Sequence, residues 1–209
     1  VYSGELPVAC TRATSLGFDA IELIPASPGG VDPEEFQEQL KRFGLELAAV
    51  GTDAGWLTRG LSLTSHSPGK RTQALDFVKS ILEFASEFKA PVTLGTVLGR
   101  AEEGTSREQA LGWLSQALRE LDTLAGKLEV PLFLEPLNRY ETNLLNRLED
   151  AVTFLQVART THVRLLGGLF HMNIEEARIP EALRQAAPYF AHIHFADSNR
   201  FAPGFGHTD

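Results

Sequence analysis

The sequence contains a single cysteine, no long apolar run and no excess of positive charge. Cys10 alone among 209 residues excludes an intrachain disulfide and fits a reducing compartment, so we expect a cytoplasmic protein. No apolar stretch approaches the about 18–20 residues of a membrane span, and no signal-peptide pattern is visible. The formal net charge of −8, with no cluster of lysine and arginine, argues against a nucleic-acid partner.

The chain repeats one unit six times, a helix followed by an apolar strand, and 43% of its residues are hydrophobic. No G-x-G-x-x-G follows the first predicted strand and no P-loop occurs, so nucleotide-binding folds lack their signature. A helix before each strand predicts a parallel sheet with right-handed crossovers. The predicted helices are 7–16, 32–43, 70–88, 106–129, 147–160 and 179–188, and the predicted strands are 18–24, 45–50, 91–97, 131–135, 163–170 and 190–196.

Polar residues lie at the ends of several predicted strands, namely Glu22, Glu135, His171 and His194. An open doubly wound sheet gathers its ligands at one switch point, whereas a closed barrel collects groups from many strand ends. We therefore predict an α/β fold, a (β/α)8 TIM barrel, formed as a single domain by residues 1–209. The sequence opens with a helix, without methionine, and closes after a strand. We expect a barrel incomplete at both ends, without its first strand and its last strand and helices.

The segment EPLNRYE, residues 135–141, carries the strongest functional signal. It follows the apolar run 130–134, which is typical of a buried parallel strand, so its acids, amide and base lie where ligands bind in α/β folds. A carboxylate buried at that place is costly unless it is paired or binds a metal. The segments LFHMNIEE, 169–176, and HIHFADSNR, 192–200, have the same layout. Together the three segments indicate a metal-dependent sugar enzyme.

The strings EPLNRYETN, FHMNIEE and HIHFADSNR-x-x-PG-x-GH-x-D, in this order, resemble the xylose isomerase-like TIM-barrel superfamily. The resemblance is closest to its sugar isomerase/epimerase branch, of the tagatose 3-epimerase and hydroxypyruvate isomerase type. It runs from about residue 17 onward and is dense from residue 135. It implies a divalent ion, Mn²⁺ first, with Mg²⁺, Co²⁺ or Zn²⁺ as alternatives, held by Glu, Asp, His and Glu from four strands.

Carried over by position, the resemblance assigns Glu135 and His194 as metal ligands, with Glu135 also the catalytic acid/base. It assigns three substrate-binding residues, Glu141, His171 and Arg200. The second metal-binding glutamate would lie beyond residue 209. The aspartate ligand falls on Gly168, and glycine offers no side-chain ligand. Either water fills that coordination position, which Mg²⁺ and Mn²⁺ tolerate, or the ion is lost.

The resemblance implies proton transfer next to the carbonyl of a small ketose or keto acid through a cis-enediolate. Related barrels are often dimers or tetramers, so a homo-oligomer is an open expectation. Gly168 leaves a second reading open, a non-catalytic sugar-binding barrel. A third reading is an abasic-site endonuclease, but this would need a multi-zinc histidine cluster and a basic groove, which six histidines and a charge of −8 disfavour.

Several neighbouring residues have less specific signals. We expect His194 to face the barrel interior and His192 to be a hydrogen-bonded core histidine. Glu22 is equally compatible with a substrate contact and with a structural ion pair. Asp197 is a candidate for orienting a ligand histidine from behind. We expect the last two residues of LFHMNIEE, 175 and 176, to cap the following helix or to lie in solvent. Trp56 is a weak candidate for covering the pocket.

Overall fold

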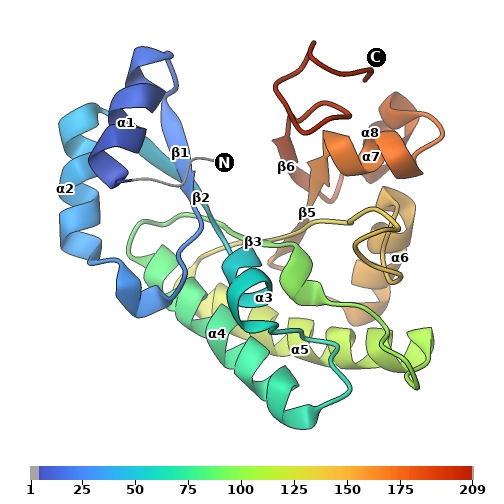
Figure 1. Ribbon diagram of the computed structural model, residues 1–209. Helices are drawn as coiled ribbons and strands as arrows, with labels where there is room; N and C mark the ends of the chain where they lie inside the picture. The colour runs from blue at the N-terminus through green and yellow to red at the C-terminus, as the bar shows by residue number, and fades with distance from the viewer. Residues whose placement is uncertain (1–4, 209) are drawn as a thin grey trace.

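Helices and strands alternate along the chain in the computed structural model, which describes residues 5–208 apart from the side chain of Pro28 (Figure 1). The elements are α1 (Leu6–Ser15), β1 (Ala20–Leu23), η1 (Pro28–Gly30), α2 (Pro33–Phe43), β2 (Glu46–Gly51), α3 (Asp53–Arg59), α4 (Pro68–Ser86), β3 (Val92–Leu94), η2 (Thr96–Leu98), α5 (Arg107–Leu128), β4 (Leu132–Leu134), α6 (Leu148–Ala158), β5 (Val163–Gly168), α7 (Leu169–Glu175), α8 (Ile179–Ala186) and β6 (Phe190–His194). All six predicted helix-then-strand units are present.

The strands form one six-stranded parallel sheet whose spatial order, β1-β2-β3-β4-β5-β6, is the order of the sequence. A doubly wound sheet would reverse direction at a switch point, and this sheet does not. The sheet is curved, as the approach of its two outer strands β1 and β6 shows: Oε1 of Glu22 on β1 lies 2.7 Å from Nε2 of His192 on β6. This is the curvature of a barrel wall, and it confirms the predicted TIM-barrel architecture.

The sequence signals at the helix ends account for their positions. The Asp32 carboxylate accepts hydrogen bonds from the first-turn amides of α2, Pro33 occupies the first turn, and Gly44 ends the helix in the left-handed region at φ 65°. Ser106 accepts a hydrogen bond from the amide of Gln109 and begins α5. Within residues 5–208, no helix has both the length and the hydropathy of a membrane span.

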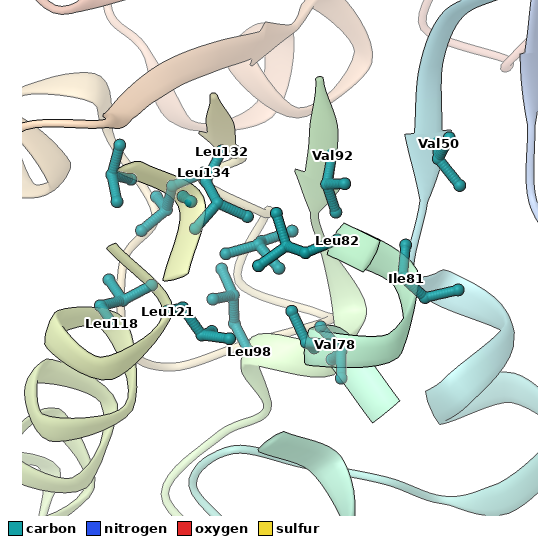
Figure 2. Close-up of a cluster of buried hydrophobic side chains, with 14 of the residues drawn as sticks. Val50, Val78, Ile81, Leu82, Val92, Leu98, Leu118, Leu121, Leu132 and Leu134 are labelled. Atoms are coloured by element: carbon teal, nitrogen blue, oxygen red, sulfur yellow. The ribbon is translucent and has the colours of Figure 1, made fainter. Parts of the chain in front are cut away.

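The hydrophobic core fills the layer between the sheet and helices α4 and α5, which run along one side of it (Figure 1). Figure 2 shows aliphatic side chains from strands and helices meeting in this layer, where burial of each contributes about 1.5–3 kcal/mol. The labelled members are Val50, Val78, Ile81, Leu82, Val92, Leu98, Leu118, Leu121, Leu132 and Leu134. The layer holds the strands rigidly, so residues at their carboxyl ends have fixed positions.

Two short helices, α3 and α7, were not predicted, and each begins within two residues of a strand end. The apolar run 163–170 was predicted as strand throughout. It leaves the strand at Gly168, and Leu169 and Phe170 form the first turn of α7. A short apolar run does not distinguish a strand from a buried helical turn. The correction places His171 on a helix rather than directly at a strand end.

Candidate metal and substrate site

Glu135 is the first residue after β4, and its carboxylate lies inside the curled sheet. Its backbone amide still bonds across to the carbonyl of Leu94 on β3 (3.0 Å), so the sheet fixes its position. Only 8% of the residue is exposed. A carboxylate this buried requires charged or hydrogen-bonding partners. Its nearest cationic partner is His194, whose Nδ1 lies 3.6 Å from Oε1 of Glu135.

His194 ends β6 and lies between two carboxylates. Its Nδ1 faces Glu135, while its Nε2 lies 3.1 Å from Oε2 and 3.2 Å from Oε1 of Glu22 on β1. His192 reaches the same Glu22 carboxylate through its own Nε2 at 2.7 Å. The prediction that only one of the two histidines faces inward was wrong, because residues two apart on a strand project from the same face.

The carboxylates and the protonated histidine of this cluster stabilise each other's charged forms. Burial disfavours the charged form of Glu22, but hydrogen bonds from His192 and His194 outweigh burial and lower the pKa of Glu22 to about 2. Burial likewise disfavours protonated His194, but hydrogen bonds to Glu135 and Glu22 outweigh it and raise the pKa of His194 to about 10. In the metal-free protein the imidazolium is therefore shared by two carboxylates. A metal ion at Nδ1 would replace one of its protons.

His171, in the first turn of α7, is held by the loop that follows Glu135. The backbone amide of Asn138 donates to Nδ1 of His171 (3.1 Å), and the side-chain amide of Asn138 lies 2.8 Å from the same atom. Burial lowers the pKa of His171, although the Glu135 and Glu141 carboxylates oppose this. Since Nδ1 accepts the backbone hydrogen bond, the ring is neutral with its proton on Nε2.

Glu141 and Arg200 form an ion pair at the rim of the site, between the loop after β4 and the loop after β6. The Arg200 guanidinium also lies over the Phe170 ring, 3.9 Å from its centre, which is the geometry of a cation–π contact. The side-chain amide of Asn138 donates to Glu141 (3.1 Å). The three sequence segments thus converge as predicted, and Asn138 links two of them.

Two acidic residues of the second segment have partners that were not predicted. Glu175 is buried and accepts two side-chain hydrogen bonds from Arg139, each 2.9 Å, and one from the Arg139 backbone amide. Glu176 accepts from the amide of Leu148 at the start of α6. The prediction that this pair caps the following helix or lies in solvent was wrong. Both residues join the α7 segment to the chain preceding it.

Asp197 organises the loop after β6 rather than a ligand histidine, so its predicted role was wrong. Its carboxylate accepts hydrogen bonds from the amides of Ser198, Gly204 and Thr208, which together lower its pKa. Its backbone carbonyl accepts from the amide of Arg200, whose φ of 64° is left-handed. The loop therefore fixes the direction of the Arg200 side chain. The last motif position, Asp209, lies outside the described residues.

Gly168, at the position of the expected aspartate ligand, lies directly against Glu135. A Cβ atom on Gly168 would be 2.3 Å from Oε1 of Glu135 and 2.8 Å from Cδ2 of His171. The backbone of Gly168, at φ −84° and ψ 114°, would accept any residue. The Glu135 carboxylate therefore occupies space that a side chain at position 168 would need.

The donor atoms fit a divalent ion in two overlapping arrangements. The 3.6 Å between Glu135 and His194 is close to the about 3.0–3.4 Å that separates neighbouring ligands with bonds of about 2.1 Å. Glu22, His192 and His194 also offer ligand atoms that all lie within 4.8 Å of one another. One imidazole with carboxylate oxygens suits Mn²⁺ or Mg²⁺, whereas two imidazoles and a carboxylate suit Zn²⁺.

Glu22 forms the structural ion pair that was one of its two predicted readings, and His192 makes the predicted hydrogen bond. Their joining of His194 in one cluster was missed, although the spacing of the two histidines on one strand places both on one face. The role of Asn138 was missed as well. For Asn138, the signal was its place in EPLNRYE, three residues from Glu135 and from Glu141. Trp56, predicted weakly as a pocket cover, lies in α3 and is 37% exposed.

Proteins similar to this chain include sugar epimerases. D-psicose 3-epimerase of Enterocloster bolteae is 30% identical over 200 residues, which are 93% of this chain and 66% of that protein. 3-dehydro-D-guloside 4-epimerase of Escherichia coli is 30% identical over 203 residues, which are 93% of this chain and 75% of that protein. This chain therefore spans just under two thirds of the length of the first relative.

Solved structures show the same fold. The apo form of 3-keto-D-glucoside 4-epimerase from E. coli matches 100% of this chain and 80% of its own, with a TM-score of 0.85 and 24% identity. The family model described as xylose isomerase-like TIM barrel matches residues 10–209. The chain belongs to the xylose isomerase-like TIM-barrel family.

Proposed function

We propose that the protein carrying this chain is a divalent-metal-dependent sugar epimerase or isomerase that acts on a small ketose or keto acid. The observation that carries the proposal is the buried Glu135 carboxylate beside His194, with His171 and the Glu141–Arg200 pair around it. The named relatives, D-psicose 3-epimerase and 3-dehydro-D-guloside 4-epimerase, support the substrate class. Residues 1–209 are proposed to act as one barrel domain, which the contiguous hydrophobic core within the described residues 5–208 supports.

Glu135 and His194 are the proposed metal ligands, and Mn²⁺ is the first choice because one imidazole combined with carboxylate oxygen and water suits this ion. When bound, the ion supplies Lewis-acid polarisation of the substrate carbonyl and a template for the neighbouring hydroxyl. Gly168 contributes no ligand, and Mn²⁺ and Mg²⁺ tolerate water at such a position.

Glu135 is also the proposed acid/base. Because its Oε1 faces His194, Oε2 is the oxygen left to take a proton from the carbon next to the carbonyl. Transfer of that proton to the neighbouring carbon on the same face gives isomerisation. Its return to the same carbon from that face regenerates the substrate, so epimerisation would require a second acid on the opposite face. Positioned proton transfer of this kind contributes about 10²–10⁴-fold to the rate.

The remaining residues bind and orient the substrate. Nε2–H of neutral His171 would donate a hydrogen bond to a substrate oxygen as negative charge develops there. The Arg200 guanidinium would donate to a hydroxyl oxygen, and Glu141 would accept from a terminal hydroxyl. The ion pair between Arg200 and Glu141 holds both side chains in place before the substrate arrives.

Exchange of a ketose proton with solvent tests this proposal. The protein is incubated in D₂O with Mn²⁺ and each of D-fructose, D-tagatose, D-psicose and L-ribulose, and loss of proton signals is followed by NMR. We expect exchange at one carbon next to the carbonyl, abolished by a chelator and reduced at least about 10²-fold in Glu135→Gln. Glu46→Gln, an exposed carboxylate on β2, is the matched control and should leave exchange unchanged. No exchange with any sugar of a broad ketose panel would contradict the proposal.

A non-catalytic sugar-binding barrel is the second candidate, and the observation in its favour is Gly168 at the expected ligand position. The same sugars, titrated calorimetrically, distinguish the two candidates. Binding of a sugar without Mn²⁺ and without proton exchange would favour the second, whereas exchange that requires Mn²⁺ would exclude it.

A further inference from the structure

Glu22 connects the two outer strands of the sheet through hydrogen bonds to histidines. It lies on β1, 172 positions before His194, and accepts from Nε2 of His194 (3.1 and 3.2 Å) and Nε2 of His192 (2.7 Å). The side chain of Glu22 is 31% exposed and that of His192 is 24% exposed, so water competes only partly for these bonds. One hydrogen bond would be enough to join β1 to β6, but Glu22 accepts hydrogen bonds from two histidines.

The arrangement assigns different tasks to the two nitrogens of His194. Nε2 is occupied by Glu22, whereas Nδ1 is turned toward Glu135, the other proposed ligand. We propose that Glu22 is a positioning residue for the metal site: it holds the proton of His194 on Nε2 and so presents the lone pair of Nδ1 to the ion. This inference rests on the proposed function, because it requires the metal to bind at Glu135 and His194.

His192 helps to hold the Glu22 carboxylate in place. It donates to Oε1 of Glu22, and its ring stacks on Phe133, with 5.6 Å between ring centres and 19° between planes. The ring also meets His194 edge-on at 5.3 Å. His192 therefore holds the Glu22 carboxylate, which in turn orients the proposed ligand His194. Carboxylates that hydrogen-bond a ligand histidine typically change metal affinity by about 10–100-fold.

The short distances favour positioning over direct coordination by Glu22, His192 and His194. At 2.7 and 3.1 Å the Glu22 oxygens are at hydrogen-bonding distance from both Nε2 atoms. An ion held by all three would have to break both bonds. It would also leave Nδ1 of His194, which faces Glu135, without a role in binding.

The experiment is calorimetric titration of Mn²⁺ into the chelator-stripped protein and into Glu22→Gln, with Glu46→Gln as the matched control on the neighbouring strand. Glutamine preserves the size of the side chain but removes the charge that stabilises the Nε2 proton. We expect the dissociation constant to rise about 10–100-fold in Glu22→Gln and to stay unchanged in Glu46→Gln. Equal melting temperatures of the metal-free forms would show that Glu22→Gln is folded.

Nitrogen-15 NMR of histidine-labelled, Mg²⁺-loaded protein gives a second test, because a purely structural Glu22 would not affect which nitrogen of His194 binds the ion. We expect Nδ1 of His194 to be the coordinated nitrogen and Nε2 to carry the proton, with a mixture of coordination modes in Glu22→Gln. Coordination through Nε2 in the unmodified protein would overturn the inference. So would unchanged Mn²⁺ affinity in Glu22→Gln, which would leave the proposed function intact.

His192→Phe separates positioning from direct coordination, since phenylalanine keeps the stacking on Phe133 but has no ring nitrogen. Positioning predicts a rise in the dissociation constant of less than about 100-fold. Loss of all binding in His192→Phe, with binding retained in Glu135→Gln, would overturn the inference and place the ion on Glu22 and the two histidines. No binding by the unmodified protein would overturn this inference together with the metal site of the proposed function.

Discussion

Replacing Gly168 by aspartate is the perturbation that most directly probes the space around Glu135. The new Cβ would lie 2.3 Å from Oε1 of Glu135, whereas ordinary contact begins at 3.4 Å, so the carboxylate must move by about 1 Å. Overpacking of this kind costs about 1–3 kcal/mol. At about 2–4 °C per kcal/mol for a chain of this size, the metal-free protein should melt about 2–12 °C lower.

Mn²⁺ should reverse this loss, because aspartate supplies the ligand that glycine lacks. We expect the dissociation constant for Mn²⁺ to fall at least about tenfold in Gly168→Asp, and by orders of magnitude if the site is otherwise intact. Mn²⁺ at 100 times its dissociation constant adds about 2.7 kcal/mol of stability, enough to offset most of the steric cost. Thermal melts with and without Mn²⁺, together with calorimetric titration, measure both effects.

Gly168→Ala is the matched control, since it adds the same Cβ without a ligand. It should lower the metal-free melting temperature as the aspartate variant does, but should gain no affinity for Mn²⁺. Equal Mn²⁺ affinity in the two variants would refute the argument that position 168 lies in the coordination sphere. An unchanged melting temperature in both would refute the packing of Glu135 against Gly168.

Three further predictions concern the surroundings of the site. Asn138→Leu removes a side-chain donor from Nδ1 of His171 and should lower kcat about tenfold in a steady-state assay; an unchanged kcat would contradict its positioning role. Glu175→Ala removes the buried acceptor of Arg139 and should cost about 1–2 kcal/mol, or about 2–8 °C in a thermal melt, because the Arg139 side chain is 59% exposed and water replaces part of the lost hydrogen bonding; a change within about 1 °C would contradict it. Burial lowers the pKa of His194, but hydrogen bonds to two carboxylates outweigh burial and raise this pKa to about 10. The protonated imidazole should therefore stabilise the metal-free protein fully below about pH 6.5, and this stabilisation should be lost as the pH rises toward 10. Melts across this range should show a smaller decline in His194→Gln, and an equal decline would contradict the assignment.

The architecture was predictable from the sequence because each repeat carries its own local signals. The aspartate before α2, the proline in its first turn and the serine before α5 act within one helical turn, and the structure uses all three. The carboxyl ends of parallel strands meet at one edge, so the convergence of Glu135, His171 and His194 followed from strand order alone. The helical turn at 169–175 was missed because its apolar residues also fit a strand.

The hydrogen-bond partners were not predictable in the same way. Glu22 and His192 are 170 positions apart, and only the curvature of the sheet brings them together. Glu175 was assigned to solvent or a cap because a local pattern does not show that Arg139, 36 positions earlier, reaches it. Asp197 was assigned to a histidine, yet the loop after β6 folds back so that its own amides reach the carboxylate. In each case the tertiary contact, rather than the sequence spacing, determines the role.

Calorimetric titration of Mn²⁺ into the chelator-stripped protein tests whether Glu135 and His194 form a metal site. We expect one site with a dissociation constant of about 1 μM or tighter, lost in Glu135→Gln and in His194→Gln. The control Glu46→Gln should bind as the unmodified protein does. A folded protein that binds no Mn²⁺, or whose binding survives both ligand substitutions, would contradict the claim that Glu135 and His194 form the metal site.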